Sequence, residues 1–368
     1  MSDSVGSFYD DQVKSYAQQT LRPLSIGELA RFGRPPLTDD AILRSARFTQ
    51  NELPVRLAKR LQGFQQLPFI VGTNPNIHAV YRLYYEAFEV LRSFPPVNTM
   101  DQEQEFSQVL QQQIKNLTNV IPQVAQGKYG FRECNKYMAG THIQKFLDEL
   151  IHSRIGLRLI GEQHVALHDV NQDYIGIIHT CLNPADLLRG YAYYVQNLCE
   201  VNYNVAPDFV INGAVDTAVQ YVPVHLEYIA CELLKNAFRA TAEHSKKCHD
   251  GRPSPIEITV ARGKKDICIR FRDQGGGIAA KDLPHVFEYS FTTVQNEPDD
   301  SEMGLGYATK VAMQSGIGGP MAGLGYGLPM ARIYACYFGG SLDLVSLEGH
   351  GCDVFLKLKN IDISDALA

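Results

Sequence analysis

The feature that most constrains the fold is a change of hydrophobic period partway along the chain. Through about the first 175 residues, apolar side chains recur at steps of three and four, the spacing of a helix with one buried face. After about Asp173, short apolar runs alternate with polar residues, which is typical of strands. The 368 residues are enough for about two domains of ordinary size. We therefore expect a helical domain at residues 1–178 and a mixed domain at residues 179–368.

The order of elements differs between these two expected domains. In the first, four long helices at about residues 53–64, 77–94, 101–120 and 141–164 predict a helical bundle. In the second, strand-like runs at 209–211, 256–260 and 267–271 alternate with helical segments at about 224–245 and 326–338. This order indicates an open sheet with helices on one face. The expected fold class is a four-helix bundle followed by an α/β sandwich.

Composition excludes several classes of protein. The chain is 45% hydrophobic and 20% charged, which is the balance of a globular protein and not of a disordered one. No apolar run approaches the ~18 residues needed to cross a bilayer, and a net charge of −6 does not point to nucleic acid. The eight cysteines lack metal-ligand spacing, so we expect them to be reduced and mostly buried. Acidic residues at positions 3, 10 and 11 make the N-terminus unlike a secretory signal or a transit peptide.

The predicted helix at 224–245 carries a row of polar residues beside its apolar stripe. Glu232, Asn236, Arg239 and Glu243 follow one another at steps of four, three and four, so they share one face. An amide oxygen can bind Mg2+, a guanidinium can pair with phosphate, and a carboxylate can accept a proton from an attacking hydroxyl. The row therefore suits a metal–triphosphate site. The alternative is a polar face that is only solvated, which has the same spacing.

A carboxylate followed by glycines ends the strand pattern at 267–271. Asp273 is followed by Gly275, Gly276 and Gly277. A carboxylate accepts a hydrogen bond from an exocyclic amine such as that of adenine. Glycines let the backbone approach a flat ring or a phosphate without obstruction by a side chain. The motif predicts a nucleotide contact, with an ordinary turn after a strand as the alternative.

A second glycine motif spans residues 323–328 and leads into an apolar helix. It consists of Gly323, Leu324, Gly325, Tyr326, Gly327 and Leu328. Free amides at a helix N-terminus bind phosphate, which makes this segment a candidate phosphate contact. Its first four residues, Gly-Leu-Gly-Tyr, occur once more from Gly304. That copy lies in a segment between Tyr289 and Met321 that is rich in Gly, Asp and Ser. We interpret that segment as a lid over a nucleotide.

The order of the three motifs resembles the N, G1 and G2 boxes of the GHKL ATPase/kinase superfamily. The stretches 232–241 and 323–329 are similar to the mitochondrial kinases of 2-oxo acid dehydrogenase complexes, and 52–64 and 153–158 resemble the helical regulatory domain of that family. Stretches 67–75, 287–293 and 356–362 resemble branched-chain 2-oxo acid dehydrogenase kinase more than pyruvate dehydrogenase kinase, and the chain has no Trp. The resemblance implies a serine kinase that inactivates the dehydrogenase component of such a complex, with the branched-chain complex favoured over the pyruvate complex.

The resemblance also implies a role for each matching residue. Glu232 is implied as the general base, Asn236 as the Mg2+ ligand, Arg239 as a triphosphate contact and Asp273 as the adenine reader. ATP contacts are implied for Gly275, Gly277, Thr292, Thr293, Gly323, Leu324, Gly325, Tyr326, Gly327 and Leu328. A K+ ion near the nucleotide is implied at Val286, Glu288 and Phe291. Cys352 stands where the family usually has Thr, and a thiol is a weak hydrogen-bonding group.

Regulation and partners are implied in the same way. Arg154 and Arg158 are implied to line an allosteric pocket for a keto acid, since paired arginines suit a carboxylate. A hydrophobic groove for the lipoyl domain of the acyltransferase core is implied at Leu24, Ile26, Leu29 and Phe32, with bundle packing as the alternative. The family further implies the thiamine-dependent component as substrate, a homodimer and the mitochondrial matrix.

Three other functions share the ATP-binding pattern. A histidine kinase needs an acceptor His in a helix, and of the candidates His142, His152, His164 and His168 the last, followed by Asp169, comes nearest to the required context. A conformational ATPase clamp needs further domains that 368 residues do not hold. A non-catalytic module is disfavoured because Glu232 and Asn236 are both present.

Overall fold

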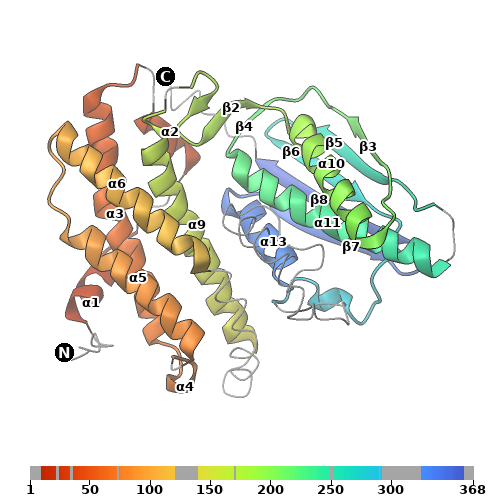
Figure 1. Cartoon of the computed structure of the whole chain (residues 1–368), viewed down its shortest axis with the longest axis horizontal. Helices are drawn as coiled ribbons and strands as arrows, with labels where there is room; N and C mark the ends of the chain where they lie inside the picture. The colour runs from red at the N-terminus through yellow and green to blue at the C-terminus, as the bar shows by residue number, and fades with distance from the viewer. Residues whose placement is uncertain are drawn as a thin grey trace. The chain divides into compact units, whose positions relative to one another are not determined.

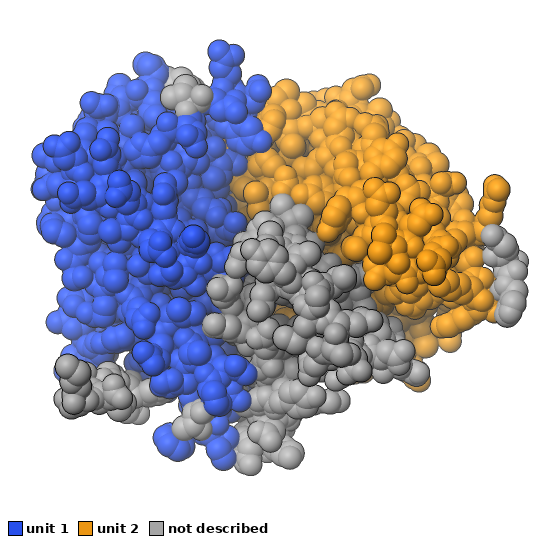
Figure 2. All heavy atoms as spheres, in the orientation of Figure 1, with its two compact units in different colours: residues 1–177, 363–368 blue, residues 178–362 orange. Residues whose placement is uncertain are grey.

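The structure, a computed structural model, describes residues 10–21, 25–33, 36–72, 74–120, 140–169, 171–248, 252–289, 291 and 325–359. The described residues divide into two compact units, with the division between Ile177 and Ile178 (Figure 2). We call them the helical unit and the sheet unit. The two units are described separately below.

The helical unit is a bundle of long helices, as the periodicity predicts (Figure 1). Helix α3 packs against α1, α5 and α9, and α6 packs against α9. Its core is built from large apolar side chains that are almost fully buried, among them Phe64, Tyr84, Phe88 and Phe106. The elements are α1 (Asp11–Ala17), α2 (Ile26–Phe32), α3 (Asp39–Gln65), α4 (Phe69–Gly72), α5 (Pro75–Ser93), α6 (Met100–Asn116), a 3-10 turn (Leu117–Asn119), α9 (Gly140–Ala166) and the short strand β1 (Tyr174–Ile175).

Helix α3 begins well before the predicted start near residue 53. Thr38 caps its first turn, because its hydroxyl accepts a hydrogen bond from the Ala41 amide. Asp39 and Asp40 in that turn interact favourably with the helix dipole. The helix continues through Pro54, which interrupts the hydrophobic pattern without ending the helix. These cap signals, not the apolar period, mark the true start.

One buried polar cluster joins α6 to α9. The Glu103 side chain is fully buried, and its Oε1 accepts a hydrogen bond from the Ser107 hydroxyl at 2.8 Å. The Nε2 atoms of His164 and His168 lie 3.0 and 2.9 Å from the same oxygen. Burial alone would raise the pKa of Glu103, but the hydrogen bonds from His164 and Ser107 outweigh burial and hold this pKa below its usual value. Glu103 is therefore ionised inside the bundle.

The sheet unit is an α/β sandwich. Its five-stranded sheet has the order β3-β5-β6-β8-β7, in which β3 and β5 are parallel and the other pairs are antiparallel. Outside this sheet, β2 and β4 form a short antiparallel pair. The elements are β2 (Ile178–Leu182), α10 (Pro184–Tyr203), β3 (Phe209–Gly213), β4 (Val219–Tyr221), α11 (Pro223–Cys248), β5 (Ile256–Arg262), β6 (Asp266–Arg272), a 3-10 turn (Leu283–His285), α13 (Gly327–Tyr337), β7 (Ser341–Leu347) and β8 (Gly351–Lys359).

One face of this sheet is apolar and covered by helices. Alternate residues of β5, β6 and β8 are buried, including Ile258, Ile269 and Leu356. Helices α10, α11 and α13 lie on that face (Figure 1), which confirms the predicted sandwich. Helix α10 was missing from the expected elements, although Asn183 and Pro184 form a capped helix start, with the Asn183 side chain accepting from the Ala185 amide.

The cysteines correct one expectation. All seven that the structure describes are free thiols, but only Cys199 and Cys231 are buried, whereas Cys181, Cys248 and Cys336 are exposed. The expectation that most cysteines are buried is therefore wrong. Among the described helices, none combines the length and the apolar character that crossing a bilayer requires.

Candidate functional site

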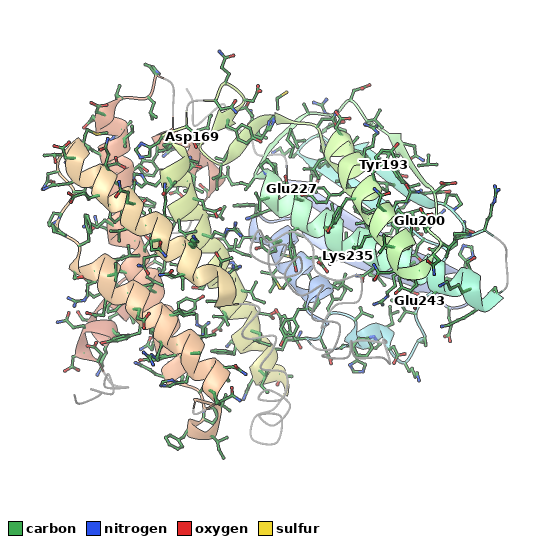
Figure 3. All side chains as sticks on the ribbon, viewed as in Figure 1. Asp169, Tyr193, Glu200, Glu227, Lys235 and Glu243 are labelled. Carbon is green, nitrogen blue, oxygen red and sulfur yellow. The ribbon has the colours of Figure 1, made fainter. Side chains whose placement is uncertain are left out.

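Helix α11 positions the predicted catalytic row. Its apolar residues, such as Leu226 and Leu233, are buried against the unit core, which turns the row toward the adjoining loops. Asn236 is exposed, and Glu232 and Arg239 are partly buried. The side-chain view labels Glu227, Lys235 and Glu243 along the same helix (Figure 3).

Glu232 has a charged partner that sequence reasoning missed. Lys235 Nζ lies 2.6 Å from Glu232 Oε1, and both side chains are largely buried. Burial would lower the pKa of Lys235, but the Glu232 carboxylate outweighs burial and raises it. Lys235 is thus a cation that occupies one oxygen of Glu232 and leaves Oε2 for other contacts. The Glu-to-Lys spacing of three residues on one helix is the signal that could have revealed this pair.

The other oxygen of Glu232 faces the start of α13. A Cβ added at Gly327 would lie 2.0 Å from Glu232 Oε2, so only glycine leaves room for the carboxylate there. Gly325, two residues earlier, has a φ of 78°, a left-handed conformation that glycine adopts without strain. The second glycine motif therefore runs directly past the predicted base.

Asp273 lies at the end of β6 and is only 7% exposed. The amides of Gly275 and Cys352 donate to its Oδ1 at 2.9 and 3.3 Å. Burial raises the pKa of this carboxyl, and the two main-chain donors only partly offset that effect. None of the hydrogen bonds among the described residues ends on Oδ2, which leaves that oxygen as an acceptor for a ligand amine.

The glycines after Asp273 are wedged between α11 and β7. A Cβ at Gly275 would lie 2.5 Å from the Ala240 Cβ of α11, and a Cβ at Gly277 would lie 2.2 Å from the Leu347 carbonyl oxygen of β7. Gly277 also has a φ of 69°. The Ile278 amide donates to Ser346 Oγ at 2.7 Å and fixes the turn on β7. Larger residues at these glycines would push the turn off the helix.

Three segments far apart in the sequence thus meet along α11. The α13 start contacts Glu232, and the Asp273 turn contacts Ala240, eight residues or ~12 Å further along the helix. Asn236 and Arg239 lie between these two contacts. Arg239 Nε is buried and has no hydrogen-bond partner among the described residues; its nearest anion, Glu243 Oε1, is 3.8 Å away. A guanidinium with a free Nε donor, between an amide and two glycine turns, is suited to an anionic ligand.

Cys352 sits directly beside Asp273. Its amide donates to Asp273, and its thiol donates to Ser346 Oγ at 3.4 Å. Burial raises the pKa of this thiol to about 11. The residue is therefore a neutral, poorly polar group at the position next to the predicted adenine reader.

The structure describes only some of the remaining residues that were implied to contact the nucleotide. Thr292, Thr293, Gly323 and Leu324 lie outside the described residues. Tyr326 is buried and packs on Tyr289, with 5.4 Å between ring centroids, and Leu328 is partly exposed.

The predicted K+ residues lie in one short turn after the 3-10 segment. Val286 is partly exposed and Glu288 is half exposed. The Phe291 amide donates to the Glu288 carbonyl at 3.4 Å, and the Glu288 carboxylate is 2.9 Å from His285 Nδ1.

The helical unit contains a pocket at the predicted allosteric arginines. It is partly open to solvent, with about 470 Å³ of empty space including the open part, and both Arg154 and Arg158 are among its lining residues. Arg154 is 9% exposed, and its Nη2 donates to the Thr118 carbonyl at 3.2 Å. Arg158 Nε lies 2.5 Å from Glu162 Oε1. The rest of the lining is mostly apolar, with Leu53, Leu57, Leu91, Leu110, Ile114 and Leu157.

The predicted lipoyl-domain groove is mostly core. Ile26 and Leu29 are 3% and 1% exposed, and Leu24 lies outside the described residues. Phe32 is partly exposed and packs on Phe48 with 5.0 Å between ring centroids. For Ile26 and Leu29 the structure corrects the groove assignment in favour of bundle packing, because α2 turns its apolar face inward.

Two family profiles match the chain, one over most of the helical unit and one over most of the sheet unit. A family profile described as mitochondrial branched-chain alpha-ketoacid dehydrogenase kinase matches residues 23–179. A second profile, described as histidine kinase-, DNA gyrase B-, and HSP90-like ATPase, matches residues 221–361.

Similar curated proteins span nearly the whole chain. A mitochondrial pyruvate dehydrogenase (acetyl-transferring) kinase of Arabidopsis thaliana is 36% identical over 340 residues, which cover 92% of this chain and 90% of that protein. The human mitochondrial isozyme 3 is 32% identical over 364 residues, covering 95% and 85%. The Schizosaccharomyces pombe kinase is 28% identical over 424 residues, covering 97% of each. The chain therefore belongs to the family of mitochondrial 2-oxo acid dehydrogenase kinases, protein-serine kinases built on a GHKL-type ATPase domain.

Proposed function

We propose that the chain transfers the γ-phosphoryl group of ATP to a serine of the thiamine-dependent dehydrogenase component of a 2-oxo acid dehydrogenase complex, and thereby inactivates it. The observation that carries this proposal is the meeting of Glu232, the α13 start and the Asp273 turn along one helix. With adenine at Asp273, the phosphates run past Arg239 and Asn236 toward Glu232, which places the reacting end of the nucleotide at the carboxylate.

The proposed reaction uses Glu232 as the base. The serine hydroxyl gives its proton to the carboxylate while the serine oxygen attacks the γ-phosphorus in line, and the bond from phosphorus to the bridging oxygen of ADP breaks. Lys235 holds one carboxylate oxygen at 2.6 Å and so orients the other toward the substrate. The unpartnered Arg239 donor would offset charge on the triphosphate.

The residues present also fit a magnesium ion. Asn236 offers an exposed amide oxygen on the same helix face as Glu232, and Mg2+ completes its coordination with phosphate oxygens and water. When bound, Mg2+ neutralises charge on the phosphates.

K+ is proposed at Val286, Glu288 and Phe291. The test is whether nucleotide affinity depends on KCl but not on NaCl.

We propose the branched-chain complex as the preferred target, on the strength of the sequence stretches at 67–75, 287–293 and 356–362 and the profile that matches residues 23–179. The pyruvate complex is the second candidate, favoured by the names of the relatives. The test offers both purified complexes to the chain with labelled ATP and locates the label by peptide mapping. Faster labelling of the pyruvate complex would reverse the preference.

The same experiment distinguishes the other functions. Acid-stable phosphoserine supports the proposal, whereas acid-labile phosphohistidine would indicate a histidine kinase. His164, one acceptor candidate, has no exposed surface. Release of free phosphate without a labelled protein would indicate a conformational ATPase, and nucleotide binding without turnover would indicate a non-catalytic module.

We propose that the helical pocket takes a short branched 2-oxo acid. An apolar lining with Arg154 at its wall suits a small apolar tail with one carboxylate. Titration calorimetry with such an acid tests this, using Arg154→Met as the variant and Arg189→Met, an exposed arginine of the sheet unit, as the matched control. Equal binding by both variants would remove the pocket from this role.

The proposed location is the mitochondrial matrix, since the relatives are named as mitochondrial. A homodimer is proposed through the outer edge of β7, where Val345 and Leu347 are 59% and 66% exposed. Val345→Lys should shift the sedimentation coefficient to that of a monomer.

The lipoyl domain of the acyltransferase core is proposed as a docking partner, with Phe32 as the described apolar contact.

A further inference from the structure

We propose that Glu103, Ser107, His164 and His168 form a binding site for a divalent cation of the zinc type, inside the helical unit and separate from the nucleotide site. The carboxylate and the two imidazoles each offer a ligand atom, and these atoms lie within 4.8 Å of one another. Two histidines four residues apart, His164 in the last turn of α9 and His168 in the turn that follows it, make with a carboxylate from α6 a donor set that Zn2+ accepts.

The spacing of the donor atoms fits a tetrahedral ion. Glu103 Oε1 is 3.0 Å from His164 Nε2 and 2.9 Å from His168 Nε2. Ser107 Oγ is 2.8 Å from Glu103 Oε1 and 3.2 and 3.5 Å from the two imidazole nitrogens. Ligand bonds of ~2.0–2.1 Å in a tetrahedron require donor separations of roughly 3.3 Å. Small outward shifts of these side chains would therefore admit an ion at the centre.

Burial and outer contacts support the site. Glu103 and His164 have no exposed surface, and Glu103 Oε2 is buried without a hydrogen-bond partner among the described residues. An ion would engage this unsatisfied carboxylate. His164 Nδ1 lies 3.0 Å from Ser45 Oγ, so an outer partner already orients the ring with Nε2 toward the cluster. The His168 side chain is 34% exposed and gives the ion a way in.

The site would join α6 to the C-terminal end of α9, because Glu103 and Ser107 come from the first helix, His164 from the second and His168 from the turn directly after it. The same two helices contribute Leu110, Ile114 and Arg154 to the pocket of the helical unit. A bound ion would thus stabilise the helix pair that lines this pocket. The proposal of this ion site does not depend on whether the kinase proposal holds.

The test uses the full chain after removal of metals with a chelator. Zn2+ is titrated by calorimetry, and Co2+ by visible absorption, into the natural chain, His168→Gln and the control His78→Gln, an exposed helix histidine outside the cluster. We expect one equivalent to bind the natural chain and the control, with at least about tenfold weaker binding to His168→Gln. The Co2+ spectrum should be tetrahedral without thiolate charge-transfer bands.

A second measurement follows folding. Zn2+ should raise the thermal midpoint of the natural chain and of His78→Gln, and should leave that of His168→Gln unchanged. Ser107→Ala, a smaller change, should weaken binding if His168→Gln unfolds. Absent binding, unchanged affinity in His168→Gln, or thiolate bands that assign the ion to cysteines would each overturn the proposal.

Discussion

Each unit contains a buried carboxylate whose pKa is shifted, and the two shifts have opposite directions. In the helical unit, Glu103 is surrounded by a hydroxyl and two imidazoles, and its pKa lies below the usual value. In the sheet unit, Asp273 receives only two main-chain amides, and burial raises its pKa. The donors to the first carboxylate are side chains that lower its pKa, whereas the donors to the second are main-chain amides that only partly offset its burial.

The difference shows that the donors around a buried carboxylate decide the direction in which its pKa shifts. Partners from another helix compensate a buried charge and make it part of the packing. The amides that bind Asp273 come from the adjoining turn and from β8, and they offset the burial of this carboxylate only in part. In the α11 row, the ion-pair partners of Glu232 and Arg239 among the described residues come from α11 itself.

The largest effect is expected from Glu232→Gln. The amide cannot accept the serine proton, so phosphate transfer to the dehydrogenase should fall by about 10²–10⁴-fold while nucleotide affinity changes little. Transfer is measured with labelled ATP and affinity by calorimetry. The control is Glu227→Gln on the same helix, whose side chain is partly buried and hydrogen-bonded to Tyr191. Unaltered transfer in Glu232→Gln would exclude this residue as the base.

Gly327→Ala comes next. The added Cβ would lie 2.0 Å from Glu232 Oε2, so the carboxylate must move while the fold remains. A displacement of about 1 Å at a reacting group costs roughly 10²-fold in rate. The matched control is Gly190→Ala in α10, where a Cβ meets nothing within 4 Å. Equal rates for the two variants would separate the α13 start from the catalytic carboxylate.

Asp273→Asn tests the open carboxylate. Loss of a charged acceptor should weaken nucleotide binding by about 10-fold or more. Since the pKa of Asp273 is raised, this group protonates at a higher pH than an ordinary carboxyl. Affinity of the natural chain should therefore fall as the pH is lowered toward that pKa, and that of Asp273→Asn should not. A parallel pH profile for both proteins would argue against a nucleotide at Asp273.

The smallest effect is expected from Glu103→Gln in the helical unit. A pKa that is lower in the folded state adds stability above the unfolded value of about 4.3, and this stability is lost as the pH falls through the folded value. The variant should lose about 1 kcal/mol near neutral pH and show a weaker decline toward acid. Urea unfolding followed by circular dichroism at several pH values measures both. An unchanged decline would mean that Glu103 is not a stabilising anion.

Much of the fold could be predicted because its signals are local. The long helices and the strands β5 and β6 carry strong periods, and the row on α11 follows from helical geometry alone. Helix α10 was not among the expected elements, although the Asn183 cap and Pro184 mark its start. The predicted start of α3 near residue 53 followed the apolar period, whereas the true start is marked by the Thr38 cap.

The missed contacts depend on how elements pack. The pairing of Glu103 with His164 and His168 requires the register of α6 against α9, which no local pattern encodes. The fit of Gly327 beside Glu232 depends in the same way on two segments 95 positions apart. Burial of Ile26 and Leu29 follows from the orientation of a seven-residue helix.

Helix α11 also has a consequence for the choice of nucleotide. Because it is unbroken from Pro223 to Cys248, the separation between the Asp273 turn and Glu232 is set by a count of residues. The helix therefore works as a molecular ruler. If the nucleotide binds as proposed, with adenine at Asp273, a diphosphate would end one phosphoryl group short of the carboxylate, and length would distinguish product from substrate.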